Sequence, residues 1–519
     1  MATGWERRDF LKSLTLGTAG LSMPRIISGA QRLPQAGSKP NIIFILADDM
    51  GYGDPSCQSV DDKIHTPHMD RLAAEGMRFT DAHSGSAVCT PSRYAILTGR
   101  YCWRSRLKRG VLRGYDAPLI EPHRETVPSM LKKHGYATAG FGKWHLGLGW
   151  KTKDGQVTPW KDGEHLQDVD FRQPIVDGPL SKGFDYYYGI AASLDMPPYC
   201  YIENDRPVQI PTEHTPGGDP HTTGFWRPGP ISPDFKHVEV LPNLTHRVAK
   251  YIDDHAGRSK ETPFFVYFAL TGPHQPIAPT DAFKGSSKAG AYGDFVVEVD
   301  WAIGEVMKAL DRNGISDGTL IIVTSDNGCP ARTHIDNNPY AMMRIYHHYP
   351  NGKLRGIKAD IWEGGHREPF IARWPGQIPA GTTSDETICL ADLMATCATI
   401  VGEDLLSNAA EDSYNILPAM LARPSGHPIR EVTIHHSSRG MYALRHGPWK
   451  LIFGLGGGGW DKDKYQAKPD DPDGQLYNVE SDIEEKVNLY DRHPDRVRTL
   501  WNALEEIKFQ GHSRPLSRT

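Results

Sequence analysis

Two pairs of oxygen-bearing side chains stand out because each follows a continuous apolar run: Asp48-Asp49 after residues 41–47 and Asp326-Asn327, preceded by Ser325, after residues 319–324. Such short apolar runs are typical of strands buried on both faces of a parallel sheet. Because functional groups gather beyond the carboxyl ends of strands in open α/β sheets, we expect the two pairs to meet. Three carboxylates and an amide oxygen suit a hard cation such as Ca²⁺ better than Zn²⁺. Taken alone, either pair is better explained by turn formation or helix capping.

Basic side chains are placed where they could complete such a site. Lys143 and His145 follow an expected strand over residues 137–141, and they alternate along an extended backbone, so both could face one cavity. His274 and Lys358 lie in segments rich in glycine and proline further along the chain. A lysine at a strand end is ordinarily solvated, and the chain has 23 histidines, so residue type alone does not select these four.

Cys89 opens the run Cys-Thr-Pro-Ser-Arg over residues 89–93, which continues as Tyr-Ala-Ile-Leu-Thr-Gly-Arg to residue 100. Taken alone, this cysteine would be interpreted as a buried apolar thiol or half of a disulfide. The full run resembles the signature of the sulfatase family, whose cysteine a maturation enzyme oxidises to Cα-formylglycine. The resemblance implies that the hydrate of this aldehyde is the nucleophile: one hydroxyl attacks sulfur, and the other later expels sulfate by regenerating the carbonyl.

The same resemblance assigns the oxygen ligands. It implies a divalent-cation site, for Ca²⁺ in preference to Mg²⁺, formed by Asp48, Asp49, Cys89, Asp326 and Asn327. It also places Ser193, which follows Gly-Ile-Ala-Ala at residues 189–192, where a serine hydrogen-bonds the nucleophile or the sulfate. The match around Ser193 is the shortest of all.

Catalytic roles for the basic residues follow from the resemblance as well. It implies that Arg93 and the cation favour the ionised hydrate at position 89. Lys143 and Lys358 would hold the sulfate. His274, in Pro-His-Gln-Pro and assisted by Lys358, would bind the leaving-group oxygen and protonate it. His145, in Gly-Lys-Trp-His-Leu-Gly, would take up the proton when sulfate is released.

Charge and the N-terminal residues bear on where the protein acts. The formal net charge of the 519-residue chain is −5, and residues 1–36 are basic, so the remainder is more acidic still. An acidic surface is poorly suited to binding nucleic acid or other long polyanions, so we expect no nucleic-acid partner.

Residues 7–12, Arg-Arg-Asp-Phe-Leu-Lys, resemble a twin-arginine export signal, and the apolar stretch over residues 14–21 is too short to span a membrane. We therefore expect export machinery as a partner and a periplasmic or secreted protein without a membrane span.

The chain is expected to be an α/β protein. Apolar strands alternate with helical patterns from residue 41 to about 402, which predicts a large, mixed, mostly parallel sheet sandwiched by helices. The resemblance implies the alkaline-phosphatase-like fold. The expected divisions are a leader (1–36), a catalytic domain (37–428) and a small C-terminal subdomain (429–519). The subdomain is predicted to hold antiparallel strands and a helix, over residues 432–435, 440–445, 449–453, 476–480, 485–489 and, for the helix, 496–507.

Three glycine- and proline-rich spans are expected to be loops near the site. The span 151–242 has little periodicity, and its candidate sugar contacts are Asp195, Tyr199, Tyr201, His221 and Trp226. The span 330–352 carries Arg332, His334, Arg344, His347 and His348. The span 454–474 is charged and glycine-rich, and we expect it to reach the substrate entrance.

These observations predict an exported, calcium-dependent sulfatase that removes sulfate from a saccharide and depends on a formylglycine-generating maturation enzyme. Two alternatives stay open. A related class of enzymes hydrolyses phosphate or phosphonate esters with the same aldehyde and fold. A non-catalytic protein that binds sulfated glycans would instead keep Cys89 as a thiol.

Overall fold

The computed structural model describes residues 39–158, 168–219, 221–330, 342–423, 426–460 and 468–516. The leader predicted over residues 1–36, with its export signal, lies outside these ranges, as do Arg332 and His334. Within the described ranges, no helix is both long and apolar enough to cross a membrane.

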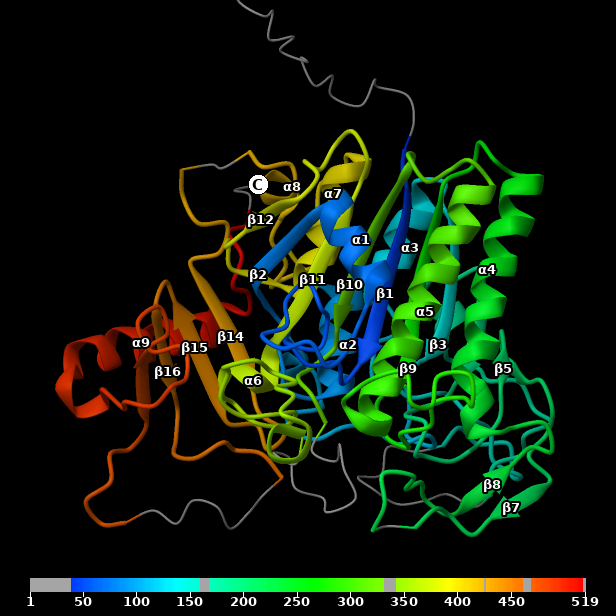
Figure 1. Ribbon diagram of the computed structural model, residues 1–519, viewed down its shortest axis with the longest axis horizontal. Helices are drawn as coiled ribbons and strands as arrows, with labels where there is room; N and C mark the ends of the chain where they lie inside the picture. The colour runs from blue at the N-terminus through cyan, green and yellow to red at the C-terminus, as the bar shows by residue number, and fades with distance from the viewer. Residues whose placement is uncertain are drawn as a thin grey trace, which may run out of the picture. The chain divides into compact units, whose positions relative to one another are not determined.

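An eleven-stranded sheet forms the centre of the protein (Figure 1), in the order β12-β2-β11-β10-β1-β9-β3-β4-β5-β6 with β13 beside β2. The central strands β10, β1, β9, β3 and β4 are parallel, while β11 runs antiparallel to both β10 and β2. The predicted mixed, mostly parallel sheet is confirmed. The strands are β1 (Asn41–Asp48), β2 (Met77–His83), β3 (Ala137–Lys143), β4 (Tyr186–Ile190), β5 (Ile202–Glu203), β6 (Arg206–Pro207), β9 (Phe264–Pro273), β10 (Thr319–Ser325), β11 (Arg367–Arg373), β12 (Thr382–Ser384) and β13 (Ile388–Cys389).

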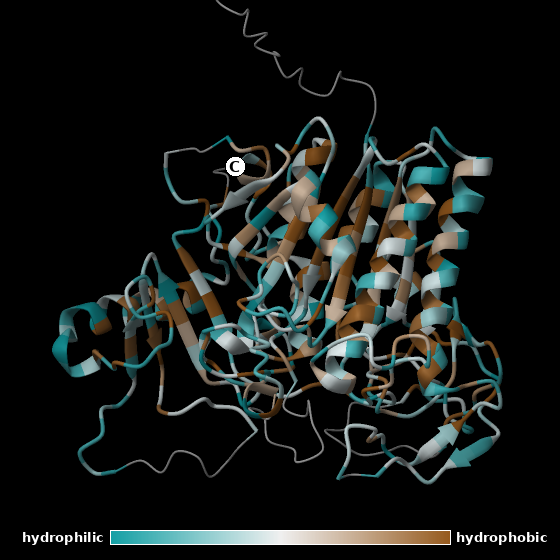
Figure 2. Cartoon of the chain, in the orientation of Figure 1, coloured by the Kyte–Doolittle hydropathy of each residue, from teal (hydrophilic) through white to brown (hydrophobic). Residues whose placement is uncertain are grey.

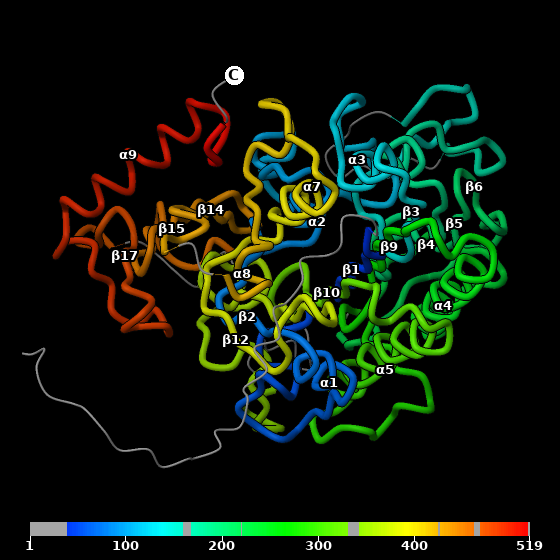
Figure 3. Tube along the Cα trace, turned by 90° about the horizontal axis from the view of Figure 1, so that it is seen from above, coloured from blue at the N-terminus to red at the C-terminus, as the bar shows by residue number. Residues whose placement is uncertain are grey.

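Helices cover both faces of this sheet, as the view from above shows (Figure 3). Alternate residues of β1 point to opposite faces: Ile42, Phe44 and Leu46 belong to one buried cluster, and Ile43 and Ile45 belong to the other. The apolar composition of these strands is clear in Figure 2. The first cluster includes residues of α2 (Cys89–Thr98), α3 (Val127–Lys133), α7 (Leu393–Val401) and α8 (Leu417–Met420), and the second includes residues of α1 (Pro67–Glu75), α4 (Val240–Arg258) and α5 (Gly290–Arg312).

The C-terminal residues form a four-stranded antiparallel sheet against which α9 (Pro494–Gln510) packs. Its strands are β14 (Val432–His436), β15 (Tyr442–His446), β16 (Trp449–Ile452) and β17 (Gln475–Asn478). The small sheet and its helix are confirmed. The expected domain boundary after residue 428 stays a prediction.

The strand predicted over residues 485–489 is wrong. Glu485 has a left-handed φ of 49°, and the backbone N–H groups of Lys486 and Val487 donate to the carboxylate of Asp482 at 2.9 Å. These donors are used inside a turn and cannot pair with a neighbouring strand. The buried Glu485 side chain instead contacts Lys450 at 2.9 Å and accepts the backbone N–H of Glu363, at the start of α6 (Glu363–His366).

The span 151–242 consists largely of loops, with short strands among them. Besides β4 to β6 it holds a hairpin of β7 (Glu213–Thr215) and β8 (Gly229–Ile231). A bridge between Tyr199 and Ile231 ties this hairpin to the loop that follows β4.

Candidate active site

The two oxygen-bearing pairs meet at one edge of the sheet, as expected. β1 and β10 are parallel neighbours in register, with Ala47 opposite Ser325, so their ends coincide. The backbone N–H of Asp49 donates to Asp326 Oδ1 at 3.2 Å, and Asn327 Nδ2 donates to Asp49 Oδ1 at 2.7 Å. Asp48, Asp49, Asp326 and Asn327 are all buried. This edge concentrates three carboxylates away from water.

The donor set fits a hard cation. Asn327 Oδ1 is buried and has no hydrogen-bond partner in the described ranges, so an acceptor oxygen is left for another ligand. One ligand atom each of Asp48, Cys89 and Asp326 lies within 4.8 Å of the others. Burial, with repulsion from Asp48, raises the pKa of Asp49 to about 7 although Lys358 opposes the shift. A bound divalent ion would relieve that repulsion.

Three basic side chains neutralise the carboxylates. Arg93 contacts Asp326 at 2.7 Å and Asp48 at 3.4 Å. Lys143 Nζ lies 2.7 Å from Asp48, and Lys358 Nζ lies 2.6 Å from Asp49. Burial raises the pKa of Asp48, but Lys143 and Arg93 outweigh it and hold that pKa below its ordinary value. The predicted sulfate-binding lysines and the predicted metal ligands therefore form one charge network.

Cys89 is the first residue of α2 and lies beside Asp48 and Asp326 of this network. The residue is buried, and burial raises the pKa of its thiol. An unmodified thiol would therefore stay protonated near neutral pH, although the helix N-terminus and two lysines favour an anion there. All seven cysteines are free, so Cys89 is not half of a disulfide.

His145 is held as a neutral ring with one free nitrogen. Its Nε2 lies 2.7 Å from the Leu112 carbonyl, which assigns the proton to Nε2, and its buried Nδ1 has no partner in the described part of the chain. Burial and the nearby Lys143 hold the pKa of His145 well below its ordinary value. The extended backbone predicted from Lys143 to His145 is wrong, because β3 ends at Lys143 and His145 has a left-handed φ of 57°. Gly142, inside β3, has a φ of 96°, and a Cβ there would lie 1.8 Å from the Ala269 carbonyl of β9.

His274 faces Ser193 across the same space. Its Nδ1 contacts the Gln275 carbonyl, and its Nε2 lies 3.3 Å from Ser193 Oγ and 3.7 Å from Asp49. Burial and Lys358 hold the pKa of His274 well below its ordinary value. The ring is therefore neutral here with the proton on Nδ1, and a general-acid role would require protonation of Nε2 when an anionic ester binds.

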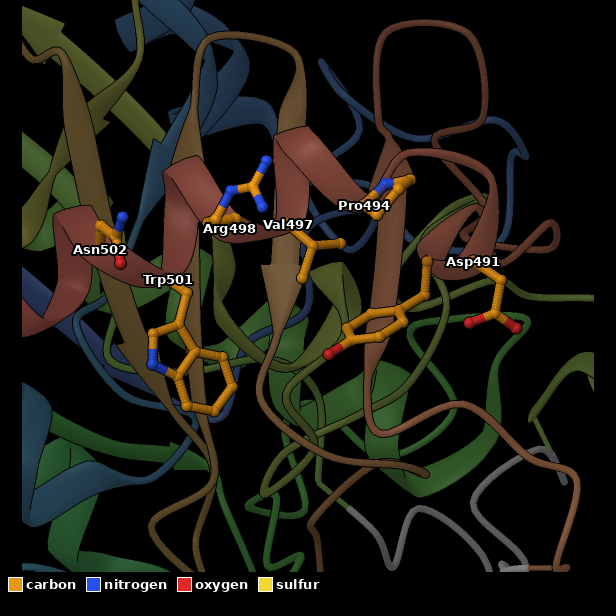
Figure 4. A pocket seen from close by; sticks show the side chains of 7 residues that line it. Asp491, Pro494, Val497, Arg498, Trp501 and Asn502 are labelled. Carbon is orange, nitrogen blue, oxygen red and sulfur yellow. The ribbon is translucent and has the colours of Figure 1, made fainter.

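A cavity of about 350 Å³ opens above these groups. Its lining includes Asp49, Cys89, Val111, Arg113, Ser193, Asp195, Met196, Phe225, Arg227, His274, Gln275, Pro330, Lys358 and Trp460. A second hollow of similar size lies on α9 and the preceding turn, between Trp501, Arg498 and Asp491 (Figure 4). Among the residues that the structure describes, no cysteine, histidine or lysine lines that hollow, whereas the first contains the groups that could carry out chemistry.

Comparison with known proteins identifies the family. A family model described as Sulfatase matches residues 40–403. The chain belongs to the sulfatase family. This sulfatase is 33% identical to an N-acetylgalactosamine-6-O-sulfatase of Bacteroides thetaiotaomicron over 91% of its own length and 94% of that protein. It is also 33% identical to human arylsulfatase A, with 80% and 75% of the two chains covered.

Solved structures agree with this assignment. A structure from work on glycosaminoglycan metabolism by Bacteroides thetaiotaomicron is 31% identical, with a TM-score of 0.77, and the match covers 91% of the sulfatase and all of that chain. A sulfatase from Pseudoalteromonas sp. is 25% identical, with a TM-score of 0.69 over 91% and 90% of the two chains. The family resemblance inferred from Cys89 and its partners is thus confirmed, and so is the alkaline-phosphatase-like fold.

Only one of the five candidate sugar contacts in the span 151–242 lines the cavity of this sulfatase. That residue is Asp195. Tyr199 is buried with its hydroxyl donating to the Arg227 carbonyl at 2.7 Å, and Tyr201 stacks on Tyr188 in the core. Trp226 stacks on His237, with ring centroids 4.4 Å apart, and His221 is exposed away from the lining. Aromatic residues in this span mostly pack the core.

Several lining residues were missed by sequence reasoning. Arg227 and Phe225 lie in the same span as the five candidates but carried no local signal. Trp460 lies in the glycine-rich span 454–474, whose described part reaches the cavity as expected. Its ring centroid is 5.7 Å from Lys358 Nζ. The repeated glycines at 456–459 allow this close approach, since a Cβ on Gly459 would lie 2.2 Å from Asp360 Oδ1.

His348, from the span 330–352, lies between two carboxylates instead of in the cavity. Its Nε2 is 2.8 Å from Asp54 and its Nδ1 is 3.0 Å from Asp61, and the ring is buried. Burial lowers the pKa of His348, but the two carboxylates outweigh it and raise the pKa to about 9. Arg344 and His347, from the same span, are exposed and do not line the cavity.

The substitution His348→Gln is expected to remove part of the pH dependence of stability. Because the folded-state pKa lies above the ordinary 6.5, protonation of His348 stabilises the fold below pH 6.5, and this contribution disappears as the pH rises through 9. The full shift of the His348 pKa would correspond to roughly 3 kcal/mol. Burial keeps the pKa of Asp54 raised despite its imidazolium partner, so we expect the ion pair to contribute less, about 2 kcal/mol. Urea unfolding of wild type and variant at about pH 6, 8 and 10 measures how the free energy of unfolding depends on pH. Equal pH dependence in wild type and variant would contradict the assignment.

A buried histidine cluster elsewhere does not suit a metal ion. One nitrogen each of His83, His366 and His435 lies within 4.8 Å of the others. The rings of His366 and His435 are stacked 3.9 Å apart with planes only 10° apart, and histidine lone pairs lie in the ring plane, so the two cannot aim at one ion. Lys450 Nζ, 3.0 Å from His366 Nε2, already donates to this cluster. These side chains join the two sheets.

Proposed function

We propose that the protein hydrolyses sulfate monoesters on a saccharide, with 6-sulfated N-acetylgalactosamine as the first substrate to test. The observation that carries the proposal is that Cys89, at the start of α2, shares one buried charge network with Asp48, Asp49, Lys143 and Lys358 at the base of a cavity. The choice of sugar is supported by similarity to the N-acetylgalactosamine-6-O-sulfatase of Bacteroides thetaiotaomicron and to the dog N-acetylgalactosamine-6-sulfatase, which is 31% identical over 89% of this chain.

The nucleophile is proposed to arise by oxidation of Cys89 to Cα-formylglycine by a maturation enzyme, because the raised thiol pKa makes the unmodified side chain a poor nucleophile. A Ca²⁺ ion held by Asp48, Asp49, Asp326 and Asn327, with the modified residue 89 as a further ligand, would supply positive charge near the nucleophile and the sulfate. Mg²⁺ fits less well because it demands a small octahedral shell with several waters.

The chain's own side chains then have distinct tasks. Lys143 and Lys358 bind the sulfate oxygens, and Arg93 supports an anion at position 89. The free Nδ1 of His145 accepts a proton when sulfate is released. His274 binds the leaving-group oxygen through Nε2, and the ester's negative charge opposes the effect of Lys358 on its pKa, which favours the protonated ring that a general acid requires.

Export is part of the proposal, with the basic leader over residues 1–36 recognised by the twin-arginine machinery and the mature protein released into the periplasm or beyond. The twin-arginine route carries folded proteins, so oxidation of Cys89 would precede export. Cell fractionation of a variant in which Arg7 and Arg8 are both replaced by lysine tests this export route. The variant is expected to accumulate in the cytoplasm in its folded form. Unchanged export would contradict the proposed route.

One experiment separates this function from both alternatives. Purified protein is assayed with matched aryl sulfate and aryl phosphate esters and with 6-sulfated N-acetylgalactosamine, and the peptide containing Cys89 is weighed by mass spectrometry. We expect sulfate release, a much slower phosphatase reaction and loss of the thiol sulfur. Faster phosphate release would favour the phosphate or phosphonate ester hydrolase. An intact thiol with binding but no turnover would favour the sulfated-glycan-binding protein.

A further inference from the structure

An ion pair in the cavity, formed by Asp195 and Arg227, has no assigned role in the chemistry proposed at residue 89. Asp195 follows Ser193 by two residues in the turn after β4 and is 2% exposed. Its Oδ2 is ion-paired with the Arg227 guanidinium, and the backbone N–H of Arg227 donates to the Asp195 carbonyl at 3.0 Å. Both residues line the cavity. These contacts therefore hold two chain segments together at the wall of the cavity.

The other carboxylate oxygen of Asp195 is unsatisfied. Asp195 Oδ1 is buried and has no hydrogen-bond partner in the ranges the structure describes. A buried carboxylate oxygen without a donor costs about 1–3 kcal/mol or more, so such an atom ordinarily faces a ligand or water. Ser193 and His274, which lie 3.3 Å apart, line the same cavity as Asp195, and the charge of Asp195 acts on the His274 ring. A ligand held at the catalytic residues would thus also reach Asp195.

Aromatic side chains in the same cavity suit a sugar ring. Trp460 is 51% exposed, and Phe225 lies beneath the Arg227 guanidinium at 5.5 Å from ring centroid to carbon. Ligand sites combine apolar and aromatic walls with a few polar groups that fix orientation. The carboxylate accepts hydrogen bonds and the guanidinium donates them. Together they complement the hydroxyl and amide groups of a sugar, which can do both. An aryl ester offers no such donor.

We propose that Asp195, oriented by Arg227, is the specificity residue that binds the sugar of the substrate, accepting a hydrogen bond at Oδ1 from a ring hydroxyl or the N-acetyl N–H. This rests on the proposed function, since it requires that the ester at residue 89 be a sugar sulfate. Asp195 contacts the sugar away from the ester. It therefore governs discrimination between sugar and aryl sulfates more than the rate of sulfur chemistry.

The test compares two substrates in one variant. For Asp195→Asn, kcat/KM for 6-sulfated N-acetylgalactosamine is expected to fall about 10- to 100-fold, mainly through KM, because a hydrogen bond to a charged group is lost. For 4-nitrophenyl sulfate the fall should be less than about fivefold, the residual effect arising because Asp195 also acts on His274. Asp195→Glu, which keeps the charge but moves the oxygen, should impair the sugar substrate similarly. The matched control is Asp253→Asn, which removes the carboxylate of an exposed pair with Arg312.

Analogues then locate the hydrogen bond. Substrates lacking one hydroxyl, or carrying hydroxyl in place of the N-acetyl group, are assayed with wild type and Asp195→Asn, and the analogue missing the bound group should be insensitive to the substitution. Equal falls for sugar and aryl sulfates, or no fall for either, would overturn the assignment. Wild-type turnover of aryl but no sugar sulfate would overturn it together with the saccharide part of the proposed function, and turnover of neither would overturn the sulfatase function itself.

Discussion

Cys89→Ala is expected to abolish sulfate release, lowering kcat by at least about 10⁴-fold, since removing the nucleophile of a hydrolase costs up to about 10⁶-fold. The alanine has no oxygen to attack sulfur, and the residual cavity with its lysines should still bind the ester. Cys89→Ser should also fail to turn over, because a single hydroxyl can attack once but cannot regenerate a carbonyl to expel the sulfate. Sulfate release under saturating substrate, measured by ion chromatography, tests both variants.

The matched control for this prediction is Cys397→Ala. Cys397 is equally buried but belongs to α7, lies in the core and does not line the cavity. It should keep activity while losing some stability, since a small buried side chain is shortened. If Cys89→Ala kept wild-type sulfate release while remaining folded, the nucleophile assignment would be wrong, and with it the whole proposed cycle.

Sequence reasoning located the ends of β1 and β10 because the information there is local. A run of apolar residues predicts a buried strand, and Asp48-Asp49 or Asp326-Asn327 after the run are the polar side chains at the end of that strand. Parallel pairing of the two strands then brings these ends together. The position of Cys89 rested instead on a resemblance spread over twelve residues. Nothing in strand periodicity would have placed it at the start of α2 beside those carboxylates.

The roles of the loop residues could not be predicted in this way, for a physical reason. Tyr199 and Tyr201 have the side chains expected of either a sugar platform or a core residue, and a span without periodicity does not say which face is buried. His348 is paired with Asp54 and Asp61, which precede it by almost 300 residues, so its ionic role is set entirely by tertiary contacts. Asp195 was one of five candidates, and only its place in the cavity lining and its unsatisfied oxygen distinguish it from the other four.

The charge network explains why a cation would matter to the fold as well as to the reaction. Asp48, Asp49 and Asp326 lie together in the interior, and burial works against ionising all three. Arg93, Lys143 and Lys358 compensate, each through a contact of 2.6–2.7 Å. A divalent ion at Asn327 Oδ1 and the carboxylates would add the positive charge that leaves the lysines available to an anionic ester.

Removing the proposed Ca²⁺ ion with a chelator is therefore expected to lower kcat/KM for sulfate esters by about 10²- to 10⁴-fold, since a metal that stabilises developing charge contributes several kcal/mol. Asn327→Ala should show the same loss at low free Ca²⁺, because it removes the orphaned ligand oxygen while leaving Arg93 and its carboxylates paired. Activity is measured against free Ca²⁺ after chelation, with Mg²⁺ in a parallel series. The variant's curve should shift to higher Ca²⁺ by about 10- to 100-fold, and Mg²⁺ should restore less.

Rescue distinguishes a ligand from a merely structural residue. If Asn327 binds the ion, millimolar Ca²⁺ should return the alanine variant to near wild-type turnover by mass action, whereas a misfolded site would not respond. Asn313→Ala is the control, because that amide bonds Asp253 and the Ala309 carbonyl on the far end of α5 and should leave the Ca²⁺ curve unchanged. A chelated wild type that kept full activity would show that the three buried carboxylates are neutralised by Arg93, Lys143 and Lys358 alone, and that the orphaned oxygen of Asn327 serves another purpose.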